Sequence, residues 1–117
     1  MRKSKDSIKV SDFVINFLSK KGVKDVFMLS GGGAMHLIDS LGRHPKMNYI
    51  CNHHEQASSM AAEAYWRISG IPGVALVTTG PAGTNAITGV MCSWTDSIPM
   101  FVLSGQAKST ALIADTG

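Results

Sequence analysis

The strongest constraint on the fold is a set of four short apolar runs separated by segments with helical character. Each run has the length of a β-strand and is apolar at largely consecutive positions; the four are 25–29, 47–51, 73–77 and 99–103. Strands of this kind are typical of a parallel sheet that is covered on both faces. Regular alternation of strands with helices indicates the α/β class. We therefore expect an α/β fold of three layers, αβα, around a mostly parallel sheet.

Helices are predicted before and between the four runs. The first has apolar side chains at helical spacing, with Ser11 as a candidate N-cap and Gly22 just beyond its end. Its expected core stripe consists of Val10, Phe13, Val14, Phe17 and Leu18. The other three segments are 34–41, 54–69 and 86–94, and Gly70 is placed to end the second of these. The predicted order is α-β four times over.

Charge is distributed unevenly along the chain. Residues 68–107 contain a single charged side chain, Asp96. Because an isolated domain usually covers part of its surface with charges, this segment predicts packing against another domain or subunit. We expect residues 1–117 to be the N-terminal part of a larger domain, with residues 1–8 as a flexible tail.

Composition excludes several classes of protein. The net charge of +3 is too small to indicate a nucleic-acid partner, and the two cysteines are too few for a disulfide scaffold. The N-terminal segment lacks the apolar centre of a signal peptide, and no run approaches the length needed to span a membrane. These features predict a cytoplasmic protein with no membrane and no nucleic-acid partner.

Three of the predicted strands end in small, turn-forming residues. The segments are Ser30–Gly33, Thr79–Asn85 and Ser104–Gln106. Ligands of open parallel sheets bind beyond the carboxyl ends of the strands, so these turns are candidate ligand contacts. Neither the lysine of a P-loop nor the third glycine of the dinucleotide fingerprint is present. Two alternatives stay open: tight turns without a ligand, or a non-catalytic module that binds a nucleotide or phosphate.

Glu55 is the strongest candidate for a residue that takes part in chemistry. It follows a predicted strand and opens a helix with no further charge until Glu63. A carboxylate there can simply interact with the helix dipole. If the helix start is buried, desolvation would instead raise the pKa of Glu55 and allow it to share a proton with a ring nitrogen. His53 and His54 are adjacent and lack partners at zinc spacing, so we predict no metal site.

Several large side chains are expected to fill the core. These are Trp66, Trp94, Met28, Met35, Met60 and Met91. Cys92 lies among them, and we predict that it is buried rather than a nucleophile.

The same segments together resemble the N-terminal, pyrimidine-binding domain of thiamine diphosphate enzymes, nearest to the large subunit of acetolactate synthase. The matching pieces run in the family's order from about residue 8 to 108: GVKDVF (22–27), GGGAM (31–35), HEQA (54–57), AAEAY (61–65), VTTGPAGTNA (77–86), DSIPM (96–100) and SGQ (104–106). Many relatives have Gly-Pro-Gly where this chain has Gly80-Pro81-Ala82. Ala82 would be strained if its backbone required positive φ.

The resemblance implies a role for each matching residue. Glu55 would hydrogen-bond the cofactor's aminopyrimidine and so activate thiamine diphosphate toward a 2-oxo acid, which loses carbon dioxide before the remaining carbanion is transferred. Pro81 and Asn85 would lie against the pyrimidine. Gly31, Gly32, Gly33 and Gln106 would line the substrate side.

The resemblance also implies what lies elsewhere in such an enzyme. The Mg²⁺ ligands and any FAD site would belong to other segments, because no matching motif occurs in these 117 residues. The full-length enzyme would be a homodimer or homotetramer and a lyase or carboligase. The 117-residue chain alone would be inactive.

Overall fold

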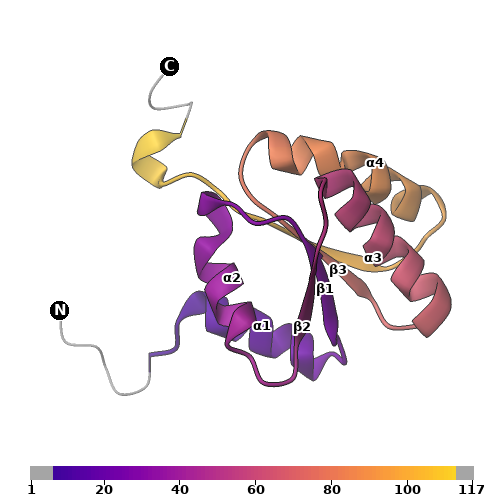
Figure 1. The fold of residues 1–117 in the computed structure, drawn as a ribbon, viewed down its shortest axis with the longest axis horizontal. Coiled ribbons are helices and arrows are strands. Elements are labelled where there is room, and N and C mark those ends of the chain that lie inside the picture. Colours follow the sequence, from indigo (N-terminus) through magenta and orange to yellow (C-terminus); the bar gives the residue numbers. More distant parts are fainter. Residues whose placement is uncertain (1–6, 113–117) are drawn as a thin grey trace.

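The computed structural model describes residues 7–112 and has the predicted alternation of helices and strands (Figure 1). Its elements are α1 (Val10–Lys20), β1 (Asp25–Met28), η1 (Gly32–Ala34), α2 (Met35–Gly42), β2 (Asn48–Cys51), α3 (Glu55–Ser69), β3 (Gly73–Val77), α4 (Pro81–Thr95), β4 (Met100–Ser104) and η2 (Ser109–Ala111). Most of the expected tail, residues 1–6, lies outside the described range. No helix of residues 7–112 is long and apolar enough to cross a membrane.

The four strands form one parallel sheet in the order β2-β1-β3-β4. In its centre Phe27 pairs with Ile50 on one side and Ala75 on the other, and Ala75 pairs with Val102. The chain moves in one direction across the sheet from β1 to β2 and in the other from β2 through β3 to β4. Since such crossovers are almost always right-handed, α2 lies on one face and α3 and α4 on the other. Figure 1 shows α1 beside α2, so the predicted three-layer αβα fold is confirmed.

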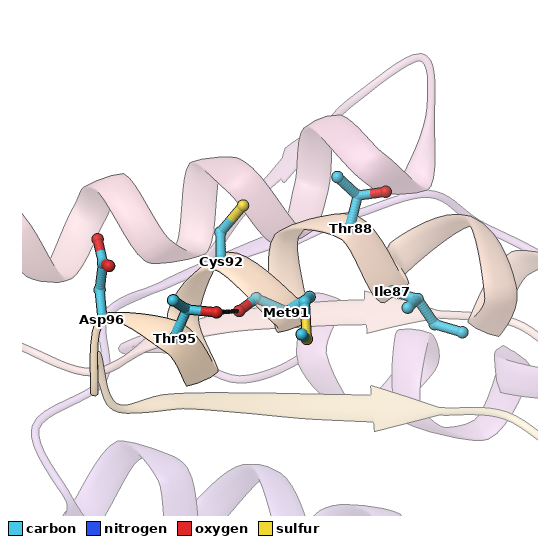
Figure 2. A pocket seen from close by; sticks show the side chains of 6 residues that line it. All are labelled: Ile87, Thr88, Met91, Cys92, Thr95 and Asp96. Atoms are coloured by element: carbon cyan, nitrogen blue, oxygen red, sulfur yellow. Dashed lines mark hydrogen bonds between the residues drawn. The ribbon is translucent and has the colours of Figure 1, made fainter.

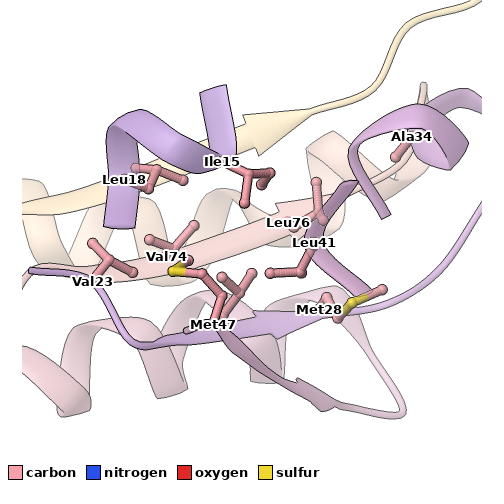
Figure 3. Close-up of a cluster of buried hydrophobic side chains, with 10 residues drawn as sticks. Ile15, Leu18, Val23, Met28, Ala34, Leu41, Met47, Val74 and Leu76 are labelled. Carbon is pink, nitrogen blue, oxygen red and sulfur yellow. The ribbon is translucent and has the colours of Figure 1, made fainter. Parts of the chain in front are cut away.

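The larger hydrophobic core lies between the sheet and the α1–α2 layer (Figure 3). Its buried side chains are Ile15, Leu18, Val23, Val26, Met28, Ala34, Leu41, Met47, Val74 and Leu76. β3 is buried at every position, as predicted for a strand covered on both faces. The same expectation is wrong for β2, whose four residues are exposed, and for β4, which is partly exposed. These are the two edge strands of the sheet.

The opposite face is packed through small side chains. On α3 the buried residues after Glu55 are Ser58, Ser59 and Ala62, and on α4 they are Ala82, Ala86, Gly89 and Ser93. A Cβ atom built on Gly89 would lie 2.7 Å from the backbone nitrogen of Met60. No side chain fits there, so α3 and α4 approach each other through backbone.

Two local predictions were wrong, and the condition attached to a third is not met. Lys9, not Ser11, occupies the N-cap of α1, and Ser11 is buried inside the helix with its Oγ 2.8 Å from the Ser40 hydroxyl. α4 begins at Pro81 rather than at residue 86, so most of the expected turn 79–85 is helical. Ala82 has no positive φ, so replacement of the family's glycine there causes no strain.

The expected core role holds for few of the large side chains. Met28 is buried and Trp66 is partly buried. The other four expected core residues are exposed: Trp94, Met35, Met60 and Met91. Cys92 is also exposed, although it was predicted to be buried.

Candidate functional site

Glu55 lies at the carboxyl edge of the sheet, where β2 leads into α3. His54 is the N-cap residue of α3, and its Nδ1 accepts a hydrogen bond of 3.1 Å from the backbone N–H of Gln56. Ser58, one turn into the helix, donates from its hydroxyl to Asn52 Oδ1 at 3.0 Å. These two bonds fix the first turn of α3, and Glu55 is only 8% exposed there. The buried helix start predicted for Glu55 is confirmed.

The carboxylate of Glu55 is held by a side chain from the neighbouring helix. Asn85 Nδ2 donates to Glu55 Oε2 at 3.0 Å. The backbone reaches this arrangement through Gly80, whose φ of 61° favours glycine, and Pro81, which begins α4. Two residues predicted separately from the sequence, Glu55 and Asn85, therefore meet in one site.

The environment lowers the pKa of Glu55 instead of raising it, so the sequence-based expectation was wrong. The hydrogen bond from Asn85 is the largest cause, followed by one from the backbone amide of Glu55 itself. Burial acts in the opposite direction but is weaker, and His54 lowers the pKa slightly further. A hydrogen bond to the charged form stabilises that form, so Glu55 is an ionised acceptor at neutral pH.

The glycine turn after β1 packs tightly against the end of β3. A Cβ atom on Gly31 would lie 2.5 Å from Thr78 Cβ, and one on Gly33 would overlap the Thr79 side chain. The Gly33 N–H donates to Thr78 Oγ1 at 3.1 Å, and the Ala34 N–H donates to the Gly31 carbonyl. These two amides are therefore already bonded within the protein.

The other predicted site residues lie at the surface. Pro81, Gly32 and Gln106 are exposed, and Gln106 accepts a hydrogen bond from the Ala107 N–H. Gly105, just before Gln106, packs against the carbonyl of Gly33. The structure therefore joins the ends of β1, β3 and β4 to one another. Its hydrogen bonds join Glu55 to Asn85 and not to the glycine turn.

A separate groove of about 470 Å³ runs along α4 and does not include Glu55 (Figure 2). Its lining residues are Ile87, Thr88, Met91, Cys92, Thr95 and Asp96. Asp96, the acid in this lining, forms an ion pair with Arg67, which also bonds Glu63 at 2.5 Å. Within residues 7–112 no three His, Cys, Asp or Glu side chains gather as metal ligands would.

Sequence reasoning missed several residues that build the site. His54 was not identified as the N-cap, although histidine just before a helix start is a weak capping signal. The Asn52–Ser58 bond and the contact of Thr78 with the glycine turn depend on the packing of α3 and β3. No local pattern could have revealed these two contacts.

Comparison with protein families agrees with the resemblance. A family model described as the N-terminal TPP-binding domain of thiamine pyrophosphate (thiamine diphosphate) enzymes matches residues 8–113. The match includes Glu55, Asn85, the glycine turn and Gln106.

Three individual relatives are subunits of acetolactate synthases. The acetolactate synthase large subunit of Buchnera aphidicola (Schizaphis graminum) is 40% identical over 102 residues, which are 87% of this chain and 18% of that protein. The isozyme 3 large subunit of Escherichia coli is 42% identical over 103 residues, 88% of this chain and 18% of the relative. The mitochondrial catalytic subunit of Saccharomyces cerevisiae is 39% identical over 98 residues, covering 84% and 14%. The chain thus spans less than a fifth of the length of these relatives.

Proposed function

Because the chain belongs to the family of N-terminal thiamine diphosphate-binding domains, we propose that it holds the pyrimidine end of that cofactor in an acetolactate synthase-like lyase or carboligase. The relatives named above are acetolactate synthases, which supports the choice of reaction class. The observation that carries the proposal is the buried Glu55 carboxylate, which is fixed through one oxygen by Asn85.

The residues present fit one end of the cofactor. A buried, ionised carboxylate with one oxygen already bonded is suited to accept a hydrogen bond from a ring nitrogen or to share its proton. Among residues 7–112, no lysine or arginine acts on the pKa of Glu55. The diphosphate and Mg²⁺ therefore require residues other than those around this carboxylate.

Each predicted residue has a defined task in this proposal. When bound, thiamine diphosphate supplies an acidic carbon and an electron sink for decarboxylation of a 2-oxo acid. Glu55 holds or moves the proton at the pyrimidine ring nitrogen. Pro81 and Asn85, at the start of α4, border the ring. The substrate side is lined by Gly31, Gly32, Gly33 and Gln106.

The wider setting follows the relatives. We propose a cytoplasmic enzyme that acts on a 2-oxo acid and works as a homodimer or homotetramer of the full-length gene product. Mg²⁺ and FAD, where the enzyme uses them, would be bound by other segments.

The test compares the only two glutamates of the chain, Glu55 and Glu63. Glu55→Gln in the full-length gene product is expected to lower turnover of pyruvate, a simple 2-oxo acid, by about 10²–10⁴-fold. Glutamine keeps the shape of the side chain but cannot exchange a proton. Glu63→Gln is the matched control, because Glu63 pairs with Arg67 away from the site, and it should retain activity. Wild-type turnover in Glu55→Gln would refute the assignment.

A further inference from the structure

Glu55 is the residue expected to contact the cofactor, but the hydrogen bonding of its carboxylate depends on the neighbouring helix, α4. The Asn85 side chain crosses from α4 to α3 and donates 3.0 Å to Oε2. Among residues 7–112, Oε1 accepts no comparable bond from another side chain. Among the described residues, the only side-chain hydrogen bond to the carboxylate is therefore the one to Oε2, and the backbone amide of Glu55 itself supplies a second hydrogen bond.

The distance that Asn85 spans is set by backbone contact one turn further along α4. Gly89 lies four residues after Asn85, so both project from neighbouring positions on one side of the helix. A Cβ on Gly89 would lie 2.7 Å from Met60 N and 2.7 Å from Ser59 Cβ. Only glycine permits this approach of α4 to α3, and the approach brings Asn85 within hydrogen-bonding distance of Glu55.

We propose that Asn85 is a positioning residue, which holds one oxygen of the Glu55 carboxylate and so orients the group toward the cofactor. This inference rests on the proposed function and changes the role expected for Asn85, from a residue that borders the ring to one that acts through Glu55. The titratable surroundings are simple. Within residues 7–112, His54 is the one neighbour whose charge acts on Glu55, and α4 contributes the neutral amide of Asn85. The loss of that amide should therefore be visible in the titration of Glu55.

The first experiment follows the carboxyl ¹³C signals of the 117-residue chain labelled in glutamate, without cofactor. With only Glu55 and Glu63 present, Glu63→Gln assigns both signals. Asn85→Ala should raise the titration midpoint of Glu55 by about one pH unit, the size of one charge-assisted hydrogen bond. The Glu63 carboxylate keeps its Arg67 partner in this variant.

A second variant guards against a folding defect. Asn85→Asp has nearly the same shape but places a second carboxylate beside Glu55, so its effect on the midpoint should exceed that of Asn85→Ala. If one of the two variants does not fold, the Glu55 midpoint of the other variant tests the proposal. Folded variants in which Glu55 titrates as in the wild type would overturn the proposal.

The second experiment uses the full-length gene product loaded with thiamine diphosphate and Mg²⁺. Asn85→Ala should lower kcat for pyruvate at least about tenfold, change KM less than about threefold, and shift the acid limb of the pH–rate profile upward with the Glu55 midpoint. A shifted titration with unchanged kcat would also overturn the proposed role. If the wild-type protein neither binds the cofactor nor turns over pyruvate, the proposed function fails. The cofactor-free titration still decides separately whether Asn85 controls the carboxylate.

Discussion

Replacement of Gly89 by alanine tests the close packing on which the site depends. Gly89 is buried in the middle of α4, where alanine is normally the better helix former. An added Cβ would overlap the Ser59 hydroxyl and would lie 2.7 Å from Met60 N. The Ser59 hydroxyl can rotate away, but the backbone of Met60 can yield only if α3 and α4 separate.

The gain in helix propensity and the cost of the packing clash differ enough in size to decide whether Gly89→Ala raises or lowers the free energy of unfolding. Glycine to alanine in a helix interior gains about 1 kcal/mol. Forcing a methyl group into a packed contact costs about 1–3 kcal/mol, and the backbone clash places Gly89→Ala toward the upper part of that range. We expect a net destabilisation of about 1–2 kcal/mol, which corresponds to a fall in Tm of roughly 3–10 °C for a chain of this size.

Urea unfolding followed by circular dichroism measures the difference. Gly83→Ala is the matched control in the same helix, since its Cβ would make only an ordinary contact, 3.5 Å from Ser104 Oγ. The control should be neutral or slightly stabilising. If Gly89→Ala were as stable as the wild type, the helices would be less tightly packed than the geometry indicates.

Three other predictions follow from the structure. Because the pKa of Glu55 is lowered in the folded state, the wild type should be more stable than Glu55→Gln at pH values above the ordinary pKa of 4.5. This difference in unfolding free energy should disappear as pH falls through the folded-state pKa. Urea unfolding that shows a constant difference at every pH would contradict this. Gly80→Ala should cost about 1–3 kcal/mol, because φ is 61° and ψ −122° there, and an unchanged unfolding midpoint would refute the strain. The 117-residue chain should sediment as species larger than its 12.4 kDa monomer, and Met91→Ser combined with Trp94→Ser should shift it toward monomer. An unchanged distribution would show that this face does not cause the association.

The sequence was informative where local chemistry decides the structure. The order of the elements, the burial of β3 and the end of α3 at Gly70, which is left-handed, all follow from apolar runs and glycine. Gly22 likewise has φ of 88° just beyond α1. The position of Glu55 at a buried helix start could also be predicted, because the residues after it are small and uncharged.

The sequence was less informative where two faces compete for burial. In α1 the side chains that face the core are Ile15 and Leu18, while Val10 and Phe13 from the predicted stripe are 76% and 57% exposed. Since α1 is apolar on two adjacent sides, periodicity alone does not determine which side meets the sheet. The prediction that the pKa of Glu55 is raised was wrong for a related reason. It depends on Asn85, thirty residues away, which reaches Glu55 only through the packing of α3 on α4.

The near absence of charge from residues 68–107 has two separate physical causes. β3 lacks charge because the chain itself buries it on both faces, between the α1–α2 layer and α3. α4 is different: its inner side contacts α3 through small residues, but its outer side exposes Ile87, Met91 and Trp94, the last at 81%. A cluster of large apolar side chains on one helix is the kind of surface for which we expect a covering protein segment, and the sedimentation experiment above tests this. The inner side of α4 therefore has small residues because α3 packs closely against it, whereas its outer side has large apolar residues that remain exposed. The close packing of the inner side also places Asn85 within hydrogen-bonding distance of Glu55.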